Sequence, residues 1–131
     1  MRTLYDFDGT LIQTIKGDAA TYKAALETVE LTKLGKQVAA TGKPIVIATA
    51  RPVFFKAEIE ACCKRHGIDA KVLPLGSMFG HMREDGKRGP RKLSTPSRKL
   101  EIAVRLNAVI VDDEEANLIA LGDRGIDAKA A

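Results

Sequence analysis

Runs of apolar residues, many of them β-branched, recur along the chain, and stretches with helical periodicity separate them. The runs are TLY at 3–5, PIVIATA at 44–50, AKVLPL at 70–75 and AVIVDD at 108–113, with a weaker fifth, GIDAKA, at 125–130. Strands that alternate with helices are typical of βαβ units, and strands as apolar as IVIA and AVIV suit a sheet covered on both faces. The pattern therefore predicts an α/β, Rossmann-like fold, with a parallel sheet of about five strands flanked by helices.

The polar punctuation between these runs predicts where five helices begin and end. Asp and Ser favour the position before a helix, Pro its first turn and Gly the position after it. We expect helices from Asp18 through Val29, from about Thr32 to Ala40, between Pro52 and Gly67, from near Ser97 through Leu106, and from about Glu114 to Leu121.

Polar residues follow three of the predicted strands at the point where each strand ends. They are Asp6 and Asp8 after the first strand, Thr49 and Arg51 after the second, and Asp112 and Asp113 after the fourth. In open parallel sheets, ligands bind beyond the carboxyl ends of the strands. Because packing requires none of these side chains, we expect them to meet at one edge of the sheet.

The four aspartates at this edge indicate a particular chemistry. Clustered carboxylates repel one another unless a cation neutralises them, and oxygen ligands with open positions suit Mg²⁺. A carboxylate can attack phosphorus to form an aspartyl-phosphate, and a second acid can protonate the leaving oxygen and then activate water. Gly9 would let the chain turn sharply between such groups.

The motifs DFDGT (6–10), IVIATAR (45–51), a downstream lysine and VIVDD (109–113) resemble those of the haloacid dehalogenase-like (HAD) superfamily of phosphohydrolases, in order and over nearly the whole chain. The resemblance implies Asp6 as nucleophile, Asp8 as general acid and base, and Thr49 as a donor to the phosphoryl group. It implies Mg²⁺ held by Asp6, the backbone carbonyl of Asp8, and Asp112, with Asp113 as a direct or water-mediated ligand. Substrate-binding roles follow for Gly9, Thr10, Ala50 and Arg51. Dehalogenases of the superfamily lack the second aspartate and ion-pumping ATPases replace it, so Asp8 implies phosphate-ester hydrolysis.

The third motif of the family, a lysine that steadies the phosphate charge, has two candidates in this sequence. Lys99 begins a helix that leads into the Asp112 strand, which favours it as the catalytic lysine, while Lys92 lies in a preceding loop and is kept as a substrate-binding residue. An ordinary surface lysine is the alternative for each. Likewise Asp8-Gly9 alone would suit a turn, Asp112-Asp113 alone a helix cap, and Asn117 an exposed helix position.

The length of the chain and its charge distribution narrow the range of possible substrates. The 131 residues fit one domain (1–131), and neither Gly9–Lys43 nor Pro52–Arg98 leaves room for a substantial cap domain. An open site suits large substrates. The net charge is +4, yet residues 83–105 hold eight basic and three acidic residues, which gives +5. We expect a basic, mobile loop at about 76–96 whose Lys87–Lys92 segment attracts polyanions.

The leading hypothesis is a Mg²⁺-dependent phosphomonoesterase acting on nucleic-acid ends or nucleotides, which resembles the phosphatase half of polynucleotide end-repair enzymes. A phosphatase of small metabolites and a non-catalytic HAD-fold binding module are the alternatives. Without a signal peptide or a long apolar run, the chain is expected to be cytoplasmic and without membrane contact. The sequence does not settle the oligomeric state, although a monomer is favoured.

Overall fold

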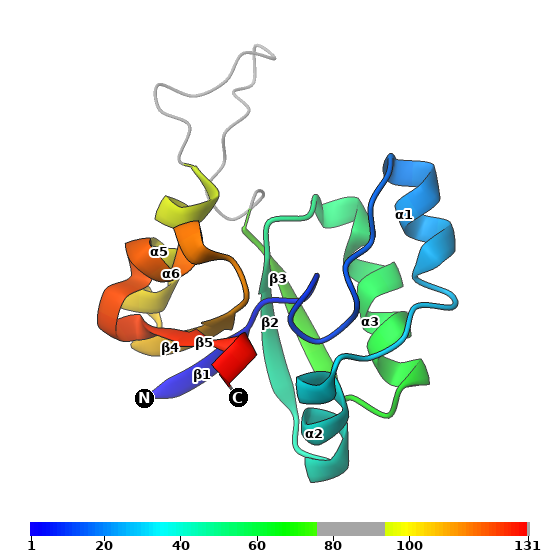
Figure 1. The fold of residues 1–131 in the computed structure, drawn as a ribbon, viewed down its shortest axis with the longest axis horizontal. Helices are drawn as coiled ribbons and strands as arrows, with labels where there is room; N and C mark the ends of the chain where they lie inside the picture. Colours follow the sequence, from blue (N-terminus) through cyan, green and yellow to red (C-terminus); the bar gives the residue numbers. More distant parts are fainter. Residues whose placement is uncertain (76–93, 131) are drawn as a thin grey trace.

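A five-stranded parallel sheet forms the centre of the computed structural model, which describes residues 1–75 and 94–130 (Figure 1). Its strands are β1 (Arg2–Tyr5), β2 (Ile45–Thr49), β3 (Ala70–Pro74), β4 (Ala108–Asp112) and β5 (Gly125–Asp127). Their order across the sheet is β3-β2-β1-β4-β5, and every neighbouring pair is parallel. The predicted fold class is confirmed.

Helices cover both faces of this sheet (Figure 1). They are α1 (Ala19–Ala25), α2 (Lys33–Thr41), α3 (Lys56–Arg65), α5 (Thr95–Arg105) and α6 (Glu115–Leu121), with short 3-10 turns at η1 (Val53–Phe55), η2 (Gly122–Arg124) and η3 (Ala128–Ala130). Side chains of α1, α2 and α3 pack with Ile47 in one apolar cluster, and those of α5 and α6 pack with Ala48 in another. The neighbouring residues Ile47 and Ala48 point to opposite faces, which explains why β2 is apolar up to its last residue, Thr49.

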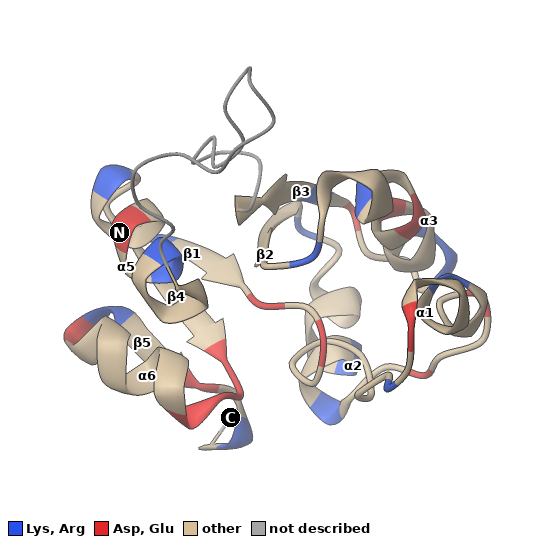
Figure 2. Cartoon of the chain, turned by 90° about the horizontal axis from the view of Figure 1, so that it is seen from above, with Lys and Arg blue, Asp and Glu red and all other residues tan. Residues whose placement is uncertain are grey.

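The pairing of β1 with its two neighbours, β4 and β2, positions the site. Tyr5 of β1 lies level with Val111 of β4 and Ile47 of β2, so β4 ends one residue beyond β1 and β2 ends two residues beyond it. The chain builds β2 and β3 on one side of β1, and β4 and β5 on the other. The strand order therefore reverses between β1 and β4, which is where open α/β sheets place their ligands. Figure 2 shows acidic residues beside one another at the tips of these two strands.

Two predicted helix boundaries were wrong. The first helix begins as expected, because the Asp18 side chain accepts a hydrogen bond from the Thr21 N–H at 2.8 Å, but it ends at Ala25 rather than Val29. Hydrogen bonds that tie residues 30–32 to residues 11–13 draw the chain away from the helix axis. The fourth helix begins at Thr95 rather than near Ser97, because Ser94 caps it.

The predicted basic loop at 76–96 falls largely outside the described residues, which resume at Ser94, and its last two residues belong to α5. Within residues 1–75 and 94–130, nothing forms a cap domain over the carboxyl edge of the sheet. None of the described helices is long and apolar enough to span a membrane.

Candidate active site and metal centre

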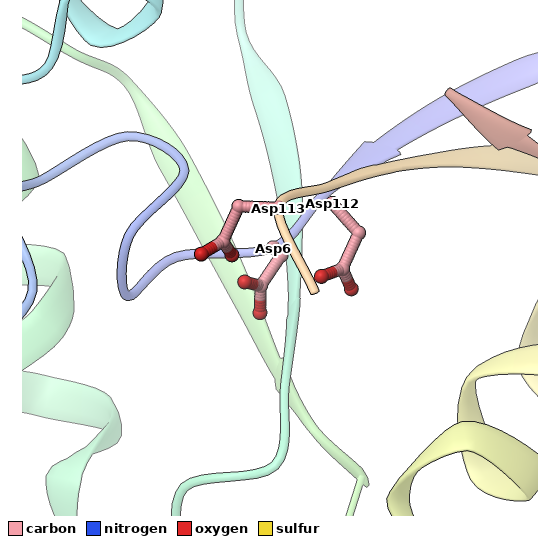
Figure 3. Close-up of side chains that lie close together, drawn as sticks. All are labelled: Asp6, Asp112 and Asp113. Atoms are coloured by element: carbon pink, nitrogen blue, oxygen red, sulfur yellow. The ribbon is translucent and has the colours of Figure 1, made fainter. Parts of the chain in front are cut away.

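Three carboxylates converge at the carboxyl edge of β1 and β4. Asp6 follows β1, Asp112 is the last residue of β4, and Asp113 follows it, and one oxygen from each lies within 4.8 Å of the others (Figure 3). The backbone joins the two strands at this point, since the Asp6 N–H donates to the carbonyl of Val111 at 2.8 Å. Two residues 106 positions apart are thus held together by strand pairing rather than by their own repelling side chains.

Lys99 inserts its ammonium between two of these carboxylates. Its side chain is only 2% exposed, and Nζ lies 2.8 Å from Oδ1 of Asp6 and 2.5 Å from Oδ2 of Asp112. Burial lowers the pKa of Lys99, but the charges of Asp6 and Asp112 outweigh burial and raise the pKa above its ordinary value. The ammonium therefore stays charged at neutral pH.

The carboxylates are still incompletely neutralised. Burial, reinforced by the charge of Asp112, raises the pKa of Asp6 from 3.8 to about 7, although Lys99 opposes the shift. The Thr10 hydroxyl lies 3.2 Å from Oδ2 of Asp6 and 3.1 Å from Oδ1 of Asp113, but it has one proton and can donate to only one of them at a time. The cluster therefore lacks positive charge or protons.

Asp112 is fixed in place by groups from the start of the following helix. Its Oδ1 accepts from the Glu114 N–H at 2.9 Å, and its Oδ2 accepts from Nδ2 of Asn117 at 3.1 Å. Asn117 is buried, and its Oδ1 has no hydrogen-bond partner among the described residues. The exposed helix position considered for Asn117 is thus wrong: it orients a carboxylate of the cluster.

Asp8 points its carboxylate away from this cluster. Arg51 donates to both Asp8 oxygens, from Nε to Oδ2 at 3.2 Å and from Nη2 to Oδ1 at 3.4 Å, and the Tyr22 hydroxyl donates to Oδ2 at 3.2 Å. Burial and the Asp8 charge raise the pKa of Tyr22 well above its usual range, so its hydroxyl remains a donor. Sequence reasoning used Tyr22 only as an apolar helix position; the signal it missed was a hydroxyl at a buried site.

A pocket of about 420 Å³ opens beside these groups, and its walls include Asp6, Asp8, Thr49, Ala50, Arg51 and Lys99. Thr49 is buried at the end of β2, and its Oγ1 accepts a hydrogen bond from the Arg51 N–H at 3.1 Å. The predicted residues that follow β1 and end β2, with Lys99 of α5, therefore face one space, whereas Gly9, Thr10, Asp112 and Asp113 are not among the residues that line it. The Thr10 hydroxyl contacts Asp6 and Asp113, and Lys92 lies outside the described residues.

The cluster fits a small divalent cation. Around Mg²⁺, with oxygens at about 2.1 Å, adjacent ligands lie about 3 Å apart and opposite ones about 4.2 Å apart, a range that carboxylates within 4.8 Å of one another can reach by small adjustments. Asp6, Asp112 and Asp113 carry three formal negative charges against the single positive charge of Lys99, and a divalent ion would offset the excess of two. Asp6, Asp112 and Asp113 would hold the ion. The part expected for the Asp8 carbonyl stays a prediction.

Gly9 leaves space for one of these ligands, and this yields a first test. Its φ is +76°, and a Cβ built on it would clash with Oδ2 of Asp113. Gly42 has a similar φ of +65° but nothing within 4 Å of a Cβ. Both Gly→Ala variants should lose about 1 kcal/mol to backbone strain. Only Gly9→Ala should also lose most of the thermal stabilisation by Mg²⁺, measured by calorimetry with and without EDTA. Equal Mg²⁺ responses in the two variants would show that Asp113 does not contribute to the ion site.

No family model, curated protein or solved structure matches this chain.

Proposed function

We propose that this protein is a Mg²⁺-dependent phosphomonoesterase of the HAD type that works through an aspartyl-phosphate on Asp6. The observation that carries the proposal is the meeting of Asp6 with Asp112, Asp113 and the buried Lys99 ammonium, beside an open pocket that Asp6 and Lys99 line. A carboxylate with a raised pKa, beside groups suited to a divalent ion, is a nucleophile that a metal would activate.

Each side chain has a definite part in the proposed reaction. An Asp6 oxygen attacks phosphorus, the bond from phosphorus to the ester oxygen breaks, and Asp8 gives its proton to that oxygen as the alcohol leaves. Asp8 then takes a proton from the water that attacks the aspartyl-phosphate. This releases inorganic phosphate, restores the Asp6 carboxylate and returns Asp8 to the protonated form in which it begins the next cycle. Lys99 and Thr49 would stabilise charge on the transferring group, and Mg²⁺ bound here would offset repulsion between nucleophile and phosphate.

The substrate class we propose is a nucleic-acid end or a nucleotide. No cap covers the pocket within the described residues, so a large phosphoester has access. The basic segment of the sequence, residues 83–105, includes the residues that lead into α5, the helix that carries Lys99. Lys87, Arg88, Arg91 and Lys92, the residues expected to bind a polyanion, lie outside the described residues, so their contribution rests on charge.

A substrate screen tests this proposal. Oligonucleotides with 3′- or 5′-phosphates, mononucleotides and sugar phosphates are compared by kcat/KM, with Mg²⁺ and with EDTA. We expect hydrolysis that EDTA abolishes, highest on one class of oligonucleotide end, with kcat/KM falling as salt rises. Replacing Lys87, Arg88, Arg91 and Lys92 together should flatten that salt dependence while leaving turnover of a small aryl phosphate unchanged.

The other outcomes of the screen have distinct meanings. Sugar phosphates turned over faster than every oligonucleotide would favour the metabolite phosphatase. Absence of Mg²⁺-dependent hydrolysis of any substrate, aryl phosphates included, would leave the non-catalytic binding module.

A further inference from the structure

The carboxylate of Asp8 is held by two residues, Arg51 and Tyr22, which also contact each other. Arg51 and Tyr22 bond to Asp8, and the Arg51 guanidinium carbon lies 3.6 Å from the centre of the Tyr22 ring. The ring in turn packs edge-on against Phe55, with centroids 4.9 Å apart and planes at 69°. Tyr22 is 1% exposed, so its ring has little freedom to move.

The two oxygens of Asp8 are not equivalent in this arrangement. Oδ2 accepts two hydrogen bonds at 3.2 Å, from Tyr22 and from Nε of Arg51, which occupies both of its lone pairs. Oδ1 accepts one longer contact, 3.4 Å from Nη2 of Arg51. Asp8 also lines the pocket. The oxygen with spare capacity is therefore Oδ1.

We propose that Tyr22 is a positioning residue that, together with Arg51, anchors Oδ2 of Asp8 and leaves Oδ1 to exchange the proton with the leaving group and the attacking water. This inference rests on the proposed phosphatase function and deepens it. The hydroxyl of Tyr22 fixes the rotation of the carboxylate, and the ring fixes the guanidinium that completes the anchor. Proton transfer is sensitive to such geometry, because donor and acceptor must come within hydrogen-bond reach at the transition state.

A positioning role of Tyr22 can be distinguished from a purely structural role by the choice of leaving group. p-Nitrophenolate is a stabilised anion that departs without a proton, whereas an alkoxide requires one from the general acid. The quantity to compare is kcat/KM, which covers the steps up to release of the leaving group and excludes hydrolysis of the aspartyl-phosphate, where Asp8 acts on water with either substrate. A residue that acts through Asp8 should therefore lower kcat/KM for alkyl phosphates and hardly change it for p-nitrophenyl phosphate. A residue that merely supports the fold should affect both substrates equally.

The test is Tyr22→Phe, which keeps the ring on Arg51 and Phe55 and removes only the hydroxyl. We expect kcat/KM on glycerol phosphate to fall about tenfold or more, within the range that general acid catalysis contributes, and kcat/KM on p-nitrophenyl phosphate to change less than about threefold. Tyr5→Phe is the matched control, because Tyr5 is the only other tyrosine of the chain and the side-chain hydrogen bonds of Asp8 in the described structure go to Tyr22 and Arg51.

Asp8→Asn provides the second arm. It should lower kcat/KM on glycerol phosphate, relative to p-nitrophenyl phosphate, more than Tyr22→Phe does. Adding Tyr22→Phe to Asp8→Asn should bring no further change in the ratio of the two kcat/KM values. Equal losses on both substrates, or an additive effect in the Asp8→Asn background, would overturn the positioning role while leaving the phosphatase intact. A wild-type protein inactive on both substrates would overturn the proposed function and this inference with it. Thermal unfolding of Tyr22→Phe verifies that the variant is folded.

Discussion

Asp6→Asn should abolish Mg²⁺-dependent phosphate hydrolysis, with a loss of roughly four orders of magnitude or more in kcat on p-nitrophenyl phosphate. The amide has the shape of the carboxylate but cannot form the acyl-phosphate bond. An activated aryl ester is the right substrate because its leaving group departs without a general acid, so formation of the aspartyl-phosphate depends on the nucleophile and not on proton donation by Asp8. The matched control is Asp18→Asn, which changes an exposed helix cap to another good cap and should leave kcat unchanged.

The same variant should be more stable than the wild type without metal. The pKa of Asp6 rises from 3.8 to about 7 in the folded protein, mainly through burial. Folding therefore takes up a proton between about pH 4 and pH 7, and the contribution of Asp6 to stability falls as pH rises through that window. Asparagine has no such titration. In EDTA, the excess stability of Asp6→Asn over the wild type should grow from pH 4 to pH 8, as measured by urea unfolding.

Mg²⁺ should reverse this order. The ion stabilises the folded wild type by binding to it, and it has one ligand fewer in Asp6→Asn. A variant that retains near-normal turnover would remove Asp6 as nucleophile. A variant that is less stable than the wild type at pH 8 in EDTA would show instead that the pairing of Asp6 with Lys99 outweighs the burial and repulsion of its charge.

The sequence predicted that the acidic residues lie close together, because this placement follows from the topology of the sheet. Asp6 and Asp112 each come at the end of an apolar strand, and parallel strands deliver their carboxyl ends to one edge whatever their order. Lys99 was accessible for a related reason: α5 runs directly into β4, so an early lysine in that helix returns to the edge where β4 ends. These placements depend on the direction of the elements and not on side-chain detail.

The hydrogen-bond partners of Asp8 and Asn117 depend on side-chain detail and could not be predicted from the sequence. Asp8 turns from the cluster because Arg51 and Tyr22 donate hydrogen bonds to its carboxylate. The direction of a tyrosine hydroxyl is decided by the packing of α1 against η1 and α3. Asn117 lies in the first turn of α6, where only the angle between α6 and β4 determines whether its amide meets solvent or Asp112. The early end of α1 has the same origin, since pairing between distant segments overrides helical periodicity.

Lys99→Met should separate catalysis from metal binding. The methionine fills the same buried space but removes the charge that lies 2.8 Å from Asp6, so kcat should fall about 10²- to 10³-fold, as for other losses of a charge-stabilising group. In EDTA the variant should be less stable by about 3–5 kcal/mol, because Asp6 and Asp112 are left buried without their cation.

Mg²⁺ should then stabilise Lys99→Met more than it stabilises the wild type, since the ion no longer competes with an ammonium for the same oxygens. Calorimetric unfolding at increasing Mg²⁺ measures this difference, and kcat on p-nitrophenyl phosphate is measured at saturating Mg²⁺. Lys36→Met, an exposed change on α2, is the matched control and should alter neither quantity. A smaller Mg²⁺ response in Lys99→Met than in the wild type would mean that the lysine organises the carboxylates for the ion rather than opposing it. Near-normal turnover would show that the phosphoryl group is stabilised by other cations of the site.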